Sequence, residues 1–568
     1  MYTIVQTVLI DETGDSYYRM RWPARRLCLQ DSELRVLSVD ARSSDRFKLG
    51  EAADLLVLYQ CSDFDWLPVI AARRKLGKKT LVEYNDNFYD PPWASPVAMQ
   101  WKSPLLWQIY EIFMQEADGI MVTGKGLEQL FKQHTDRPVH ILENYIHLDL
   151  EPFSSVFESP ANEIRIGWAG SLGHVPDLLA IAPLFNEIIE RYRNVKIMVM
   201  GNDSLPELLK LPSDRFVFRG WGSMQQYYEF IKQLHIGLVP ILDTPYNNCR
   251  SDIKAVELAA WGVLPIVSKA PPYHDFLAKT GAPAFTSLHD LSLLVESYLQ
   301  DPSKIAVDAE RCYRYVESER QDRLRSERLE LYRSYLPAAK SSFEWKQGPG
   351  YHELASDLVS QSRTSLAFDA YRKAVARGLK DDALNLLRTE LNYNPWNIDV
   401  ALVLLAALAA SGSGECLNLM DEYIARFPRD LRLAILKAWY RSTKELGTED
   451  WRRVIEAMAE IDPYSRQIFY PDLERRFLPL IKSNRDIYQF ALELALVLDD
   501  FAALRFEVAQ TALAIGDLTN AELYFSQLCD QRRLVSSSSA MLSQIQANYL
   551  PCMQQSVQAR IAGKFGKD

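Results

Sequence analysis

The sequence predicts an α/β protein with two parallel, doubly wound sheets, followed by an all-α region of helical repeats. Short apolar runs alternate with helical stretches through the first 335 residues, which is typical of parallel strands covered by helices on both faces. The alternation begins anew near Glu163, which indicates a second sheet. From about Ser341 the strand-like runs stop, and Ala- and Leu-rich helical patterns continue. We therefore expect Rossmann-like domains at 1–155 and 156–338 and a helical domain at 341–568.

Each predicted strand is a short run of mostly apolar residues. In the first domain these runs cover 4–10, 34–39, 55–59, 80–84 and 120–122, and in the second 164–168, 195–200, 216–218, 236–239 and 264–267. Ligands of such sheets bind at the carboxyl ends of the strands. The loops that follow these runs are therefore the places to search for a site.

The composition excludes several classes of protein. Of the 568 residues 48% are hydrophobic and 24% charged, as in ordinary soluble proteins, and the net charge of −10 argues against a general nucleic-acid-binding protein. Seven cysteines are scattered without C-x-x-C spacing, which indicates reduced thiols and no structural zinc. We find no signal peptide and no apolar run of the ~20 residues that a membrane span needs. The protein is expected to be cytoplasmic, at most peripheral to the inner face of a membrane.

The stretch 247–269 carries the strongest indication of a ligand. A helix is expected to begin at Ser251 and Asp252 and to stop at Gly262 before a buried strand. Free N–H groups in its first turn, Ile253 included, together with the charge of Lys254, favour a phosphate. Glu257 lies three residues beyond Lys254 on the same face, where a carboxylate can accept both hydroxyls of a ribose. This pattern indicates a nucleoside diphosphate, although an ordinary helix joining two strands would also fit.

The pattern Ser251-x-x-Lys254-x-x-Glu257-x-x-Ala260-x-Gly262-x-x-Pro265 resembles the donor-binding helix of retaining glycosyltransferases of the two-Rossmann-domain, or GT-B, type, in the family 4 group. The resemblance implies that Glu257 binds the ribose of a nucleotide sugar in the cleft between the domains. It also implies a retained anomeric configuration, no bound metal, no cofactor beyond the nucleotide-sugar co-substrate, and a closing helix within 311–336. The first Glu of the family's E-x7-E pair is replaced here by Cys249.

Further donor-binding candidates follow the strands of the second domain. A glycine loop after the first strand would let backbone amides approach a diphosphate or sugar. Glycine-containing turns follow the second and third strands, and this order of motifs along the chain resembles that of the family. Trp221 would stack on the nucleobase, or it is a core aromatic. The candidates from these loops are Gly170, Ser171, Gly173, His174, Gly201, Gly220 and Trp221.

Two loops of the first domain are expected on the acceptor side. The loop 11–19 contributes Gly14, Tyr18 and Arg19, with a solvated turn as the alternative. The loop 83–92 contributes Asn85 and Asp86, and Asp86 would orient an acceptor hydroxyl or act on the sugar face. An acidic metal motif is not favoured there, because no His cluster accompanies it. We expect Asp86 and Lys254 to be the catalytic residues, with Lys254 stabilising the charge on a diphosphate leaving group.

An aromatic stretch lies between residues 91 and 116. An amphipathic segment of this kind would sit on a bilayer or cover a lipid-linked acceptor. The favoured interpretation is that it packs a helix onto the sheet. The aromatic residues are Trp93, Trp101, Trp107, Tyr110 and Phe113.

The helical region shows a weak repeat. Asn394-Pro395, Phe427-Pro428 and Asp462-Pro463 follow helical stretches at separations of 33 and 35 residues, close to the ~34-residue tetratricopeptide period. The segment 509–525 looks like a better-formed repeat. Stacked helix pairs make concave surfaces that suit a peptide or partner protein. A rigid buttress or a dimer interface is the alternative.

The sequence thus predicts a hexosyltransferase-type enzyme that moves a sugar from a nucleoside-diphosphate sugar to an acceptor. The acceptor would be a protein docked on the repeats, a polysaccharide or a lipid-linked saccharide. The main alternative is a non-catalytic scaffold, which the replacement at Cys249 would fit. An epimerase or a phosphorylase on the same fold ranks below both.

Overall fold

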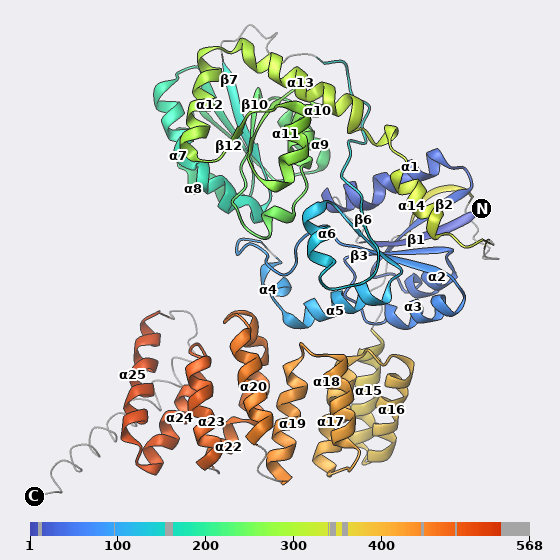
Figure 1. The fold of residues 1–568 in the computed structure, drawn as a ribbon, viewed down its shortest axis with the longest axis vertical. Helices are drawn as coiled ribbons and strands as arrows, with labels where there is room; N and C mark the ends of the chain where they lie inside the picture. The colour runs from blue at the N-terminus through green and yellow to red at the C-terminus, as the bar shows by residue number, and fades with distance from the viewer. Residues whose placement is uncertain are drawn as a thin grey trace, which may run out of the picture. The chain divides into compact units, whose positions relative to one another are not determined.

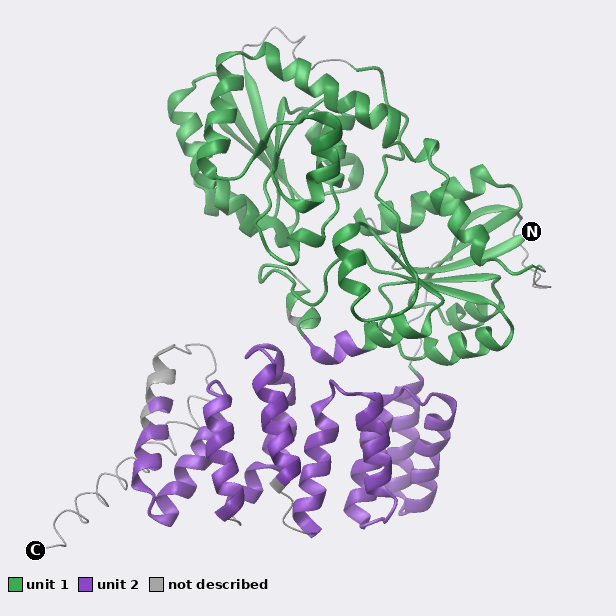
Figure 2. Cartoon of the chain, in the orientation of Figure 1, with its two compact units in different colours: residues 1–102, 109–362 green, residues 103–108, 363–568 purple. Residues whose placement is uncertain are grey.

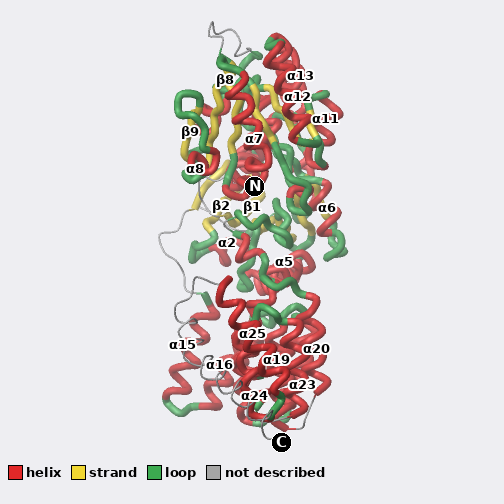
Figure 3. Tube along the Cα trace, turned by 90° about the vertical axis from the view of Figure 1, so that its left-hand side faces the viewer, coloured by secondary structure: helices red, strands yellow, loops and turns green. Residues whose placement is uncertain are grey.

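The computed structural model describes residues 1–8, 14–95, 97–153, 163–338, 340, 348–354, 362–444, 448–482 and 485–534. It forms two compact units, residues 1–102 with 109–362, and residues 103–108 with 363–568 (Figure 2). Parallel sheets and their helices make up the first unit, and the described part of the second unit is helical (Figures 1 and 3). This agrees with the predicted fold class.

The first sheet has seven parallel strands in the order β13-β2-β1-β3-β4-β5-β6. Its central strands form because their apolar residues are buried on both faces, as the continuous runs predicted. The chain order changes direction between β1 and β3, which places a crevice at the carboxyl ends of these strands. The strands are β1 Tyr2–Val8, β2 Leu34–Asp40, β3 Leu55–Tyr59, β4 Lys79–Glu83, β5 Gly119–Val122, β6 Val139–Ile141 and β13 Gly350–Leu354.

Helices cover both faces of the first sheet. The segment after β1 is a π-helix, a wide turn that often occurs at functional sites. Positions 9–13, the start of the predicted acceptor-side loop, lie outside the described residues. The helices are η1 Ser16–Arg21, α1 Trp22–Gln30, α2 Arg46–Ala52, α3 Trp66–Lys75, α4 Ala98–Trp101, α5 Pro104–Glu116, α6 Lys125–Phe131 and α14 Glu327–Tyr335.

Two strands of this sheet were not predicted. The strand β6 has three half-buried residues, and β13 has five, so neither shows a buried apolar run. The strand β13 pairs in parallel with β2 at the edge of the sheet, although 341–568 was predicted to be helical throughout. The helical pattern therefore begins only with α15, at Arg363.

The second sheet has six parallel strands in the order β12-β11-β10-β7-β8-β9. Five of them match the predicted runs, and the two-residue β12 was too short to predict. Their bounds are β7 Ile164–Ala169, β8 Val195–Gly201, β9 Phe216–Gly220, β10 Ile236–Val239, β11 Leu264–Ser268 and β12 Ala284–Phe285. The helices are η3 Leu172–His174, α7 Val175–Arg191, α8 Leu205–Leu209, α9 Met224–Ile231, η4 Asn247–Cys249, α10 Ile253–Ala260, η5 Pro271–Tyr273, α11 His274–Thr280, α12 Leu288–Gln300 and α13 Ser303–Glu319.

The helical segment Leu172–Arg191 is, in the described part of the chain, long and apolar enough to cross a membrane. Its apolar face packs into the core of the second sheet, where Leu178, Leu184 and Phe185 are fully buried. The sequence shows no unbroken apolar run here because Asp177 and Glu187 lie within the segment. Its composition is that of a core helix.

Two crossover chains join the sheet domains of the first unit. The N–H of Ile146 donates to the carbonyl of Arg320, and the N–H of Asp322 donates to the carbonyl of Ile146, both at 2.9 Å. The predicted closing helix is broken here by the short turn η6 Asp322–Leu324. After this turn α14 packs on α1, and Tyr332 is fully buried in the core of the first sheet.

Consecutive helices pack against each other in the second unit. Equivalent side chains hydrogen-bond at a separation of 33 residues, as in Asn397 with Thr364 and Arg432 with Asp399. Their separation equals one of the two spacings of the sequence repeat. The helices are α15 Arg363–Ala376, α16 Lys380–Tyr393, α17 Ile398–Ser411, α18 Cys416–Arg426, α19 Leu431–Lys444, α20 Thr448–Glu460, η7 Ser465–Phe469, α21 Tyr470–Arg476, α22 Leu478–Ile481, α23 Arg485–Val497, α24 Ala502–Ile515 and α25 Leu518–Leu534.

The aromatic stretch 91–116 is mostly buried. Trp101, Tyr110 and Phe113 lie in the core, and Trp107 is half-buried. These four residues support the packing interpretation. Trp93 differs, because 77% of its surface is exposed.

Candidate functional site

A cavity of about 370 Å³ opens between the two sheet domains of the first unit. It is lined by segments that follow β1, β4 and β5 in one domain and β7, β9 and β10 in the other. Most predicted site residues meet here. Those that line the cavity are Gly14, Tyr18, Arg19, Asn85, Asp86, Gly170, Ser171, His174, Trp221, Ser251, Ile253, Lys254 and Glu257.

The helix α10 brings the two central residues into the cavity. It begins at Ile253, two residues after the predicted start at Ser251, and the positive φ of +69° at Gly262 follows its end. Ala255 and Ala259 are fully buried, so the helix packs closely against its own domain. The opposite face presents Lys254 and Glu257 to the cavity.

Lys254 is held beside the glycine loop. Its ammonium donates to the carbonyl of Ala169 at 3.2 Å. Burial, with a smaller effect of Arg250, lowers the pKa of Lys254 to about 7. A Cβ at Gly170 would lie 3.0 Å from this ammonium and 2.5 Å from the Trp168 ring, so only glycine fits without a shift.

Both carboxylate oxygens of Glu257 accept hydrogen bonds from tyrosines. The Tyr18 hydroxyl donates to Oε1 at 2.5 Å and the Tyr227 hydroxyl donates to Oε2 at 2.8 Å. Only 4% of Glu257 is exposed. This burial raises the pKa of Glu257 to about 7, while the two tyrosines and Lys254 act in the opposite direction.

Arg250 is a cavity residue to which sequence analysis assigned no role. Its Nε has no hydrogen-bond partner in the described part of the chain, and its guanidinium lies 4.6 Å from the Tyr246 ring centre. Burial acts against its charge, but Tyr246 and Asp86 keep the pKa of Arg250 above its usual value. Gly173 does not line the cavity, and a Cβ there would lie 3.5 Å from the Arg250 guanidinium, an ordinary van der Waals contact. The sequence feature that could have indicated this residue is its position, because Arg250 is a basic residue shortly before the start of α10.

Asp86 and Asn85 reach the cavity from the end of β4. Burial raises the pKa of Asp86, against the effects of Arg250 and of a hydrogen bond from Tyr246. The side-chain amide of Gln60 donates to Asn85 Oδ1, and Gln60 has a φ of +44°, which is unusual for a residue other than glycine. Gln60 thus fixes the orientation of the Asn85 side chain, a role that the sequence did not reveal.

Arg19 lines the cavity, but most of its guanidinium is bound inside the first domain. Its Nε donates to Glu83 at 2.5 Å, and another nitrogen donates to Leu142 O and Asn144 Oδ1 at 2.6 and 2.8 Å. The side chain of Asn144 in turn donates to the Ser251 hydroxyl at 3.1 Å. Arg19 therefore supports a contact between the first domain and the segment before α10.

His174 belongs to a network that holds the loop after β10. Its Nδ1 lies 3.0 Å from Asp177 Oδ2, and Asp177 Oδ1 accepts from the N–H of Leu242 and from Asn247. Burial, with the charges of Arg250 and Lys254, lowers the pKa of His174 well below its usual value. This shift favours the neutral imidazole.

Four predicted donor-binding residues do not line the cavity. At Gly173 a Cβ would be in ordinary contact with Arg250. Gly201 lets β8 approach the glycine loop, because a Cβ there would lie 2.8 Å from Gly170 O. Gly220 lies near Asp203. The carboxylate of Asp252 is bound by Arg320 at 2.5 and 2.8 Å, so this side chain anchors the helix start instead of facing the cavity.

The sequence also missed Tyr227, which lines the cavity beside Trp221. Trp221 is 57% exposed, so its ring is available to a ligand and is not a core aromatic. Cys249 lines an adjoining cavity of about 730 Å³, which shares Thr123, Arg250 and Ser251 with the first. The thiol thus lies next to the predicted donor site.

Searches for relatives gave similarities of structure only. No protein-family model matches the chain, and no curated protein matches its sequence. The HepE protein of Anabaena, solved with UDP and glucose, has a TM-score of 0.45 and 12% identity, covering 59% of this chain and 100% of that one. Sucrose-phosphate synthase from Thermosynechococcus elongatus has a TM-score of 0.43 and 12% identity, covering 59% and 99%. A glycosyltransferase from Rickettsia africae has a TM-score of 0.42 and 12% identity, covering 60% and 99%. Similarities at this level carry no conclusion about the activity of this chain.

Proposed function

We propose that the chain is a glycosyltransferase that moves a sugar from a nucleoside-diphosphate sugar to an acceptor hydroxyl. The observation that carries this proposal is the arrangement of Lys254 and Glu257, one turn apart on α10 and facing one cavity with the Gly170 loop. A carboxylate accepts hydrogen bonds from both ribose hydroxyls, and an ammonium beside a glycine loop binds a diphosphate. Trp221 offers an exposed ring to the nucleobase.

The leaving diphosphate would be stabilised by two cations of the second domain. Lys254 and Arg250 both line the cavity, and each lies in a partly or fully enclosed position where charge–charge interactions are strong. As the bond between the anomeric carbon and the diphosphate breaks, negative charge grows on the phosphate oxygen. A nearby diphosphate would keep Lys254 protonated, because an opposite charge raises the pKa of an amine.

The first domain would bind the acceptor. Asn85 and Asp86 face the same cavity as Lys254, with Gly14 at its edge. We assign Asp86 to orient the acceptor hydroxyl or to act on the sugar face, with its ionised form favoured by Arg250. The proposed reaction is that of family 4: it retains the anomeric configuration and needs no metal. It would take place in the cytoplasm, where the acceptor lies next to a membrane or is a protein held by tetratricopeptide-like repeats. The resemblance of the motif around Lys254 and Glu257 supports the reaction type.

A ligand panel tests the proposal. The full chain would be heated with UDP, GDP, ADP or CMP and with their sugar conjugates, and one nucleotide should raise the unfolding midpoint. A ligand at ~100 times its dissociation constant adds about 2.7 kcal/mol of apparent stability. With the corresponding nucleotide sugar, slow release of the nucleotide should follow. If no nucleotide binds, the proposal is wrong, and binding without release would indicate a non-catalytic protein.

A further inference from the structure

Tyr18 contacts both the nucleotide side of the cavity and the connection between the domains. It lies on η1 of the first domain, and its hydroxyl donates to Glu257 of the second domain at 2.5 Å. Because that proton is used, the Tyr228 hydroxyl, 2.6 Å away, donates to the Tyr18 oxygen. Tyr18 is 6% exposed, so this bond is enclosed.

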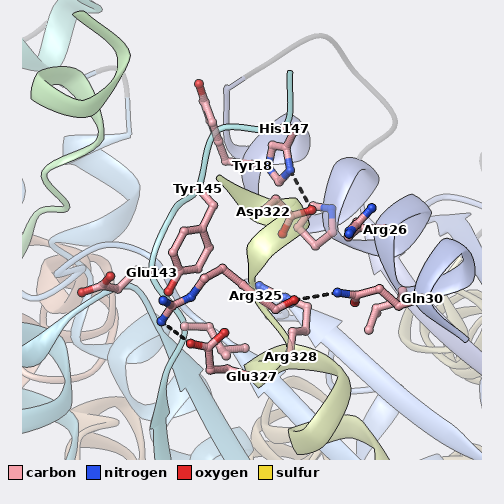
Figure 4. Close-up of a pocket in the computed structure, with 13 residues that line it drawn as sticks. Tyr18, Arg26, Gln30, Glu143, Tyr145, His147, Asp322, Arg325, Glu327 and Arg328 are labelled. Atoms are coloured by element: carbon pink, nitrogen blue, oxygen red, sulfur yellow. Dashed lines mark hydrogen bonds and ion pairs between the residues drawn. The ribbon is translucent and has the colours of Figure 1, made fainter. Parts of the chain in front are cut away.

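The other face of the Tyr18 ring meets the crossover chain. Its ring centre lies 5.7 Å from that of His147, the residue after the hydrogen-bonded Ile146. His147 Nδ1 lies 3.2 Å from Asp322 Oδ2 on the returning crossover. Tyr18, His147 and Asp322 are among the residues that line a small cavity of about 30 Å³ (Figure 4). Tyr18 thus connects the point where the crossovers meet to the carboxylate of α10.

The two tyrosines on Glu257 differ in one respect. Tyr227 is on α9 of the same domain as Glu257, so its bond does not depend on the separation of the domains. The bond from Tyr18 forms only when the first domain approaches. A carboxylate has about four acceptor positions, so these two bonds leave two for a pair of ribose hydroxyls.

We propose that Tyr18 is a positioning residue that makes nucleotide binding at Glu257 depend on closure of the two domains. This inference rests on the proposed function, because it assigns the remaining acceptor positions of Glu257 to a ribose. With Tyr18 in place the carboxylate is oriented for the ribose, and the bond favours its ionised form. With the domains apart it keeps only the Tyr227 bond.

The charge state of Glu257 gives this role a specific signature. The groups that face the carboxylate are Tyr18 from η1, Tyr227 from α9 and Lys254 from its own helix, with Tyr228 acting through Tyr18. The bond from Tyr18 lowers the pKa of Glu257. Without this bond the pKa of Glu257 should be higher. On acidification, nucleotide affinity should therefore fall at a higher pH than in the parent.

The test compares Tyr18→Phe with Tyr17→Phe, a neighbouring tyrosine whose ring packs on Tyr18 but which donates no hydrogen bond to Glu257 among the contacts of the described residues. Titration calorimetry with the sugar conjugates of UDP, GDP and ADP, whose diphosphates do not titrate near neutrality, would be run across the pH range around neutrality. Tyr18→Phe should weaken binding about tenfold at neutral pH, the scale of one hydrogen bond to a charged group, and shift the acid limb upward. Tyr17→Phe should do neither.

Hydrogen exchange at the crossovers provides a readout that needs no nucleotide. In the free protein Tyr18→Phe should speed exchange at 144–148 and 320–323. Tyr227→Phe, which loses a hydrogen bond to Glu257 within the second domain, should leave exchange there unchanged. If Tyr18→Phe exchanges as slowly as the parent, the proposed role of Tyr18 is wrong. It is also wrong if the parent binds a nucleotide through Glu257 and Tyr18→Phe binds it with the same affinity and the same pH profile. If the parent binds no nucleotide while the exchange difference is present, the proposed function fails and the interdomain contact stands.

Discussion

Arg320 donates two hydrogen bonds, of 2.5 and 2.8 Å, to the carboxylate of Asp252. Asp252 precedes α10, and Arg320 follows α13 where the chain returns to the first domain. The same guanidinium donates to the carbonyl of Asn144 on the other crossover at 2.9 Å. The start of the helix that carries Lys254 and Glu257 is therefore fixed to both chains that connect the sheet domains.

Asp252→Ala should strongly destabilise the first unit. It removes both hydrogen bonds to a carboxylate from the Arg320 side chain, which is 3% exposed, and leaves only Glu143 Oε2, 4.0 Å from Nε, among the carboxylates of the described residues. Breaking a buried ion pair by removing one partner costs about 3–5 kcal/mol. Urea unfolding of the full chain, followed by circular dichroism, should show the loss.

The matched control for this variant is Lys125→Ala. The ion pair between Lys125 and Asp275 has a short distance, 2.7 Å, but both side chains are mostly exposed. Exposed pairs contribute little because water and salt screen them. An equal effect of the two substitutions would mean that the Arg320–Asp252 contact has no special role.

Affinity for a nucleotide sugar should be highest close to pH 7. Ionised Glu257 accepts the ribose hydroxyls, so affinity should fall as the pH drops below its pKa of about 7. Protonated Lys254 binds the diphosphate, so affinity should fall as the pH rises above its pKa of about 7. Calorimetry with a nucleotide sugar, whose diphosphate does not titrate in this range, measures both limbs.

Two variants separate these limbs. Glu257→Gln should remove the acid limb, and Lys254→Arg should remove the alkaline limb because arginine stays charged. A pH profile that neither variant alters would assign the titration to other groups.

Trp221→Ala should weaken nucleotide binding without weakening the fold. Its ring lines the cavity and is 57% exposed, so little packing is lost on truncation. Stacking of a base on an aromatic ring contributes about 1–3 kcal/mol. Trp93→Ala, which removes a ring that is 77% exposed and does not line this cavity, is the control for calorimetry. Equal affinities of these two variants would exclude stacking on Trp221.

Gly170→Ala should destabilise the second sheet domain and disturb Lys254. The new Cβ would lie 2.5 Å from the Trp168 ring, which must shift. Overpacking of this kind costs about 1–3 kcal/mol. At Gly14 a Cβ meets no atom of the described residues within 4 Å, so Gly14→Ala should leave the unfolding transition in place. Similar unfolding midpoints for both variants would show that the loop around Gly170 accommodates the added methyl group without a cost in stability.

The sequence predicted the sheets well where strands are buried on both faces. The continuous apolar run of β3, for example, is typical of a central parallel strand. The strands β6 and β13 have half-buried residues without such runs. They form because a neighbouring strand, β5 or β2, already offers a row of backbone groups to pair with.

The sequence predicted most of the residues that the structure brings to one cavity, but it did not predict the partners of their side chains. The rule that ligands bind at the carboxyl ends of parallel strands located Asn85 and Gly170, and the pattern of a helix start located Lys254. Asp252 and Arg19 instead bind partners 68 and 64 residues away in the sequence, contacts that no local pattern encodes. The donation from Tyr18 to Glu257 across 239 residues is of the same kind.

The central claim, that Glu257 binds the ribose of a nucleotide, is tested most directly with a modified ligand. Calorimetry would compare the nucleoside diphosphate that binds the parent with its 2′,3′-dideoxy analogue, in the parent and in Glu257→Gln. Two hydrogen bonds to a carboxylate are lost in the parent, at about 1.5–3 kcal/mol each, so the analogue should bind the parent at least tenfold more weakly. In Glu257→Gln the difference should largely disappear. Equal binding of both ligands by the parent, or an unchanged difference in the variant, would contradict the assignment of Glu257 to the ribose.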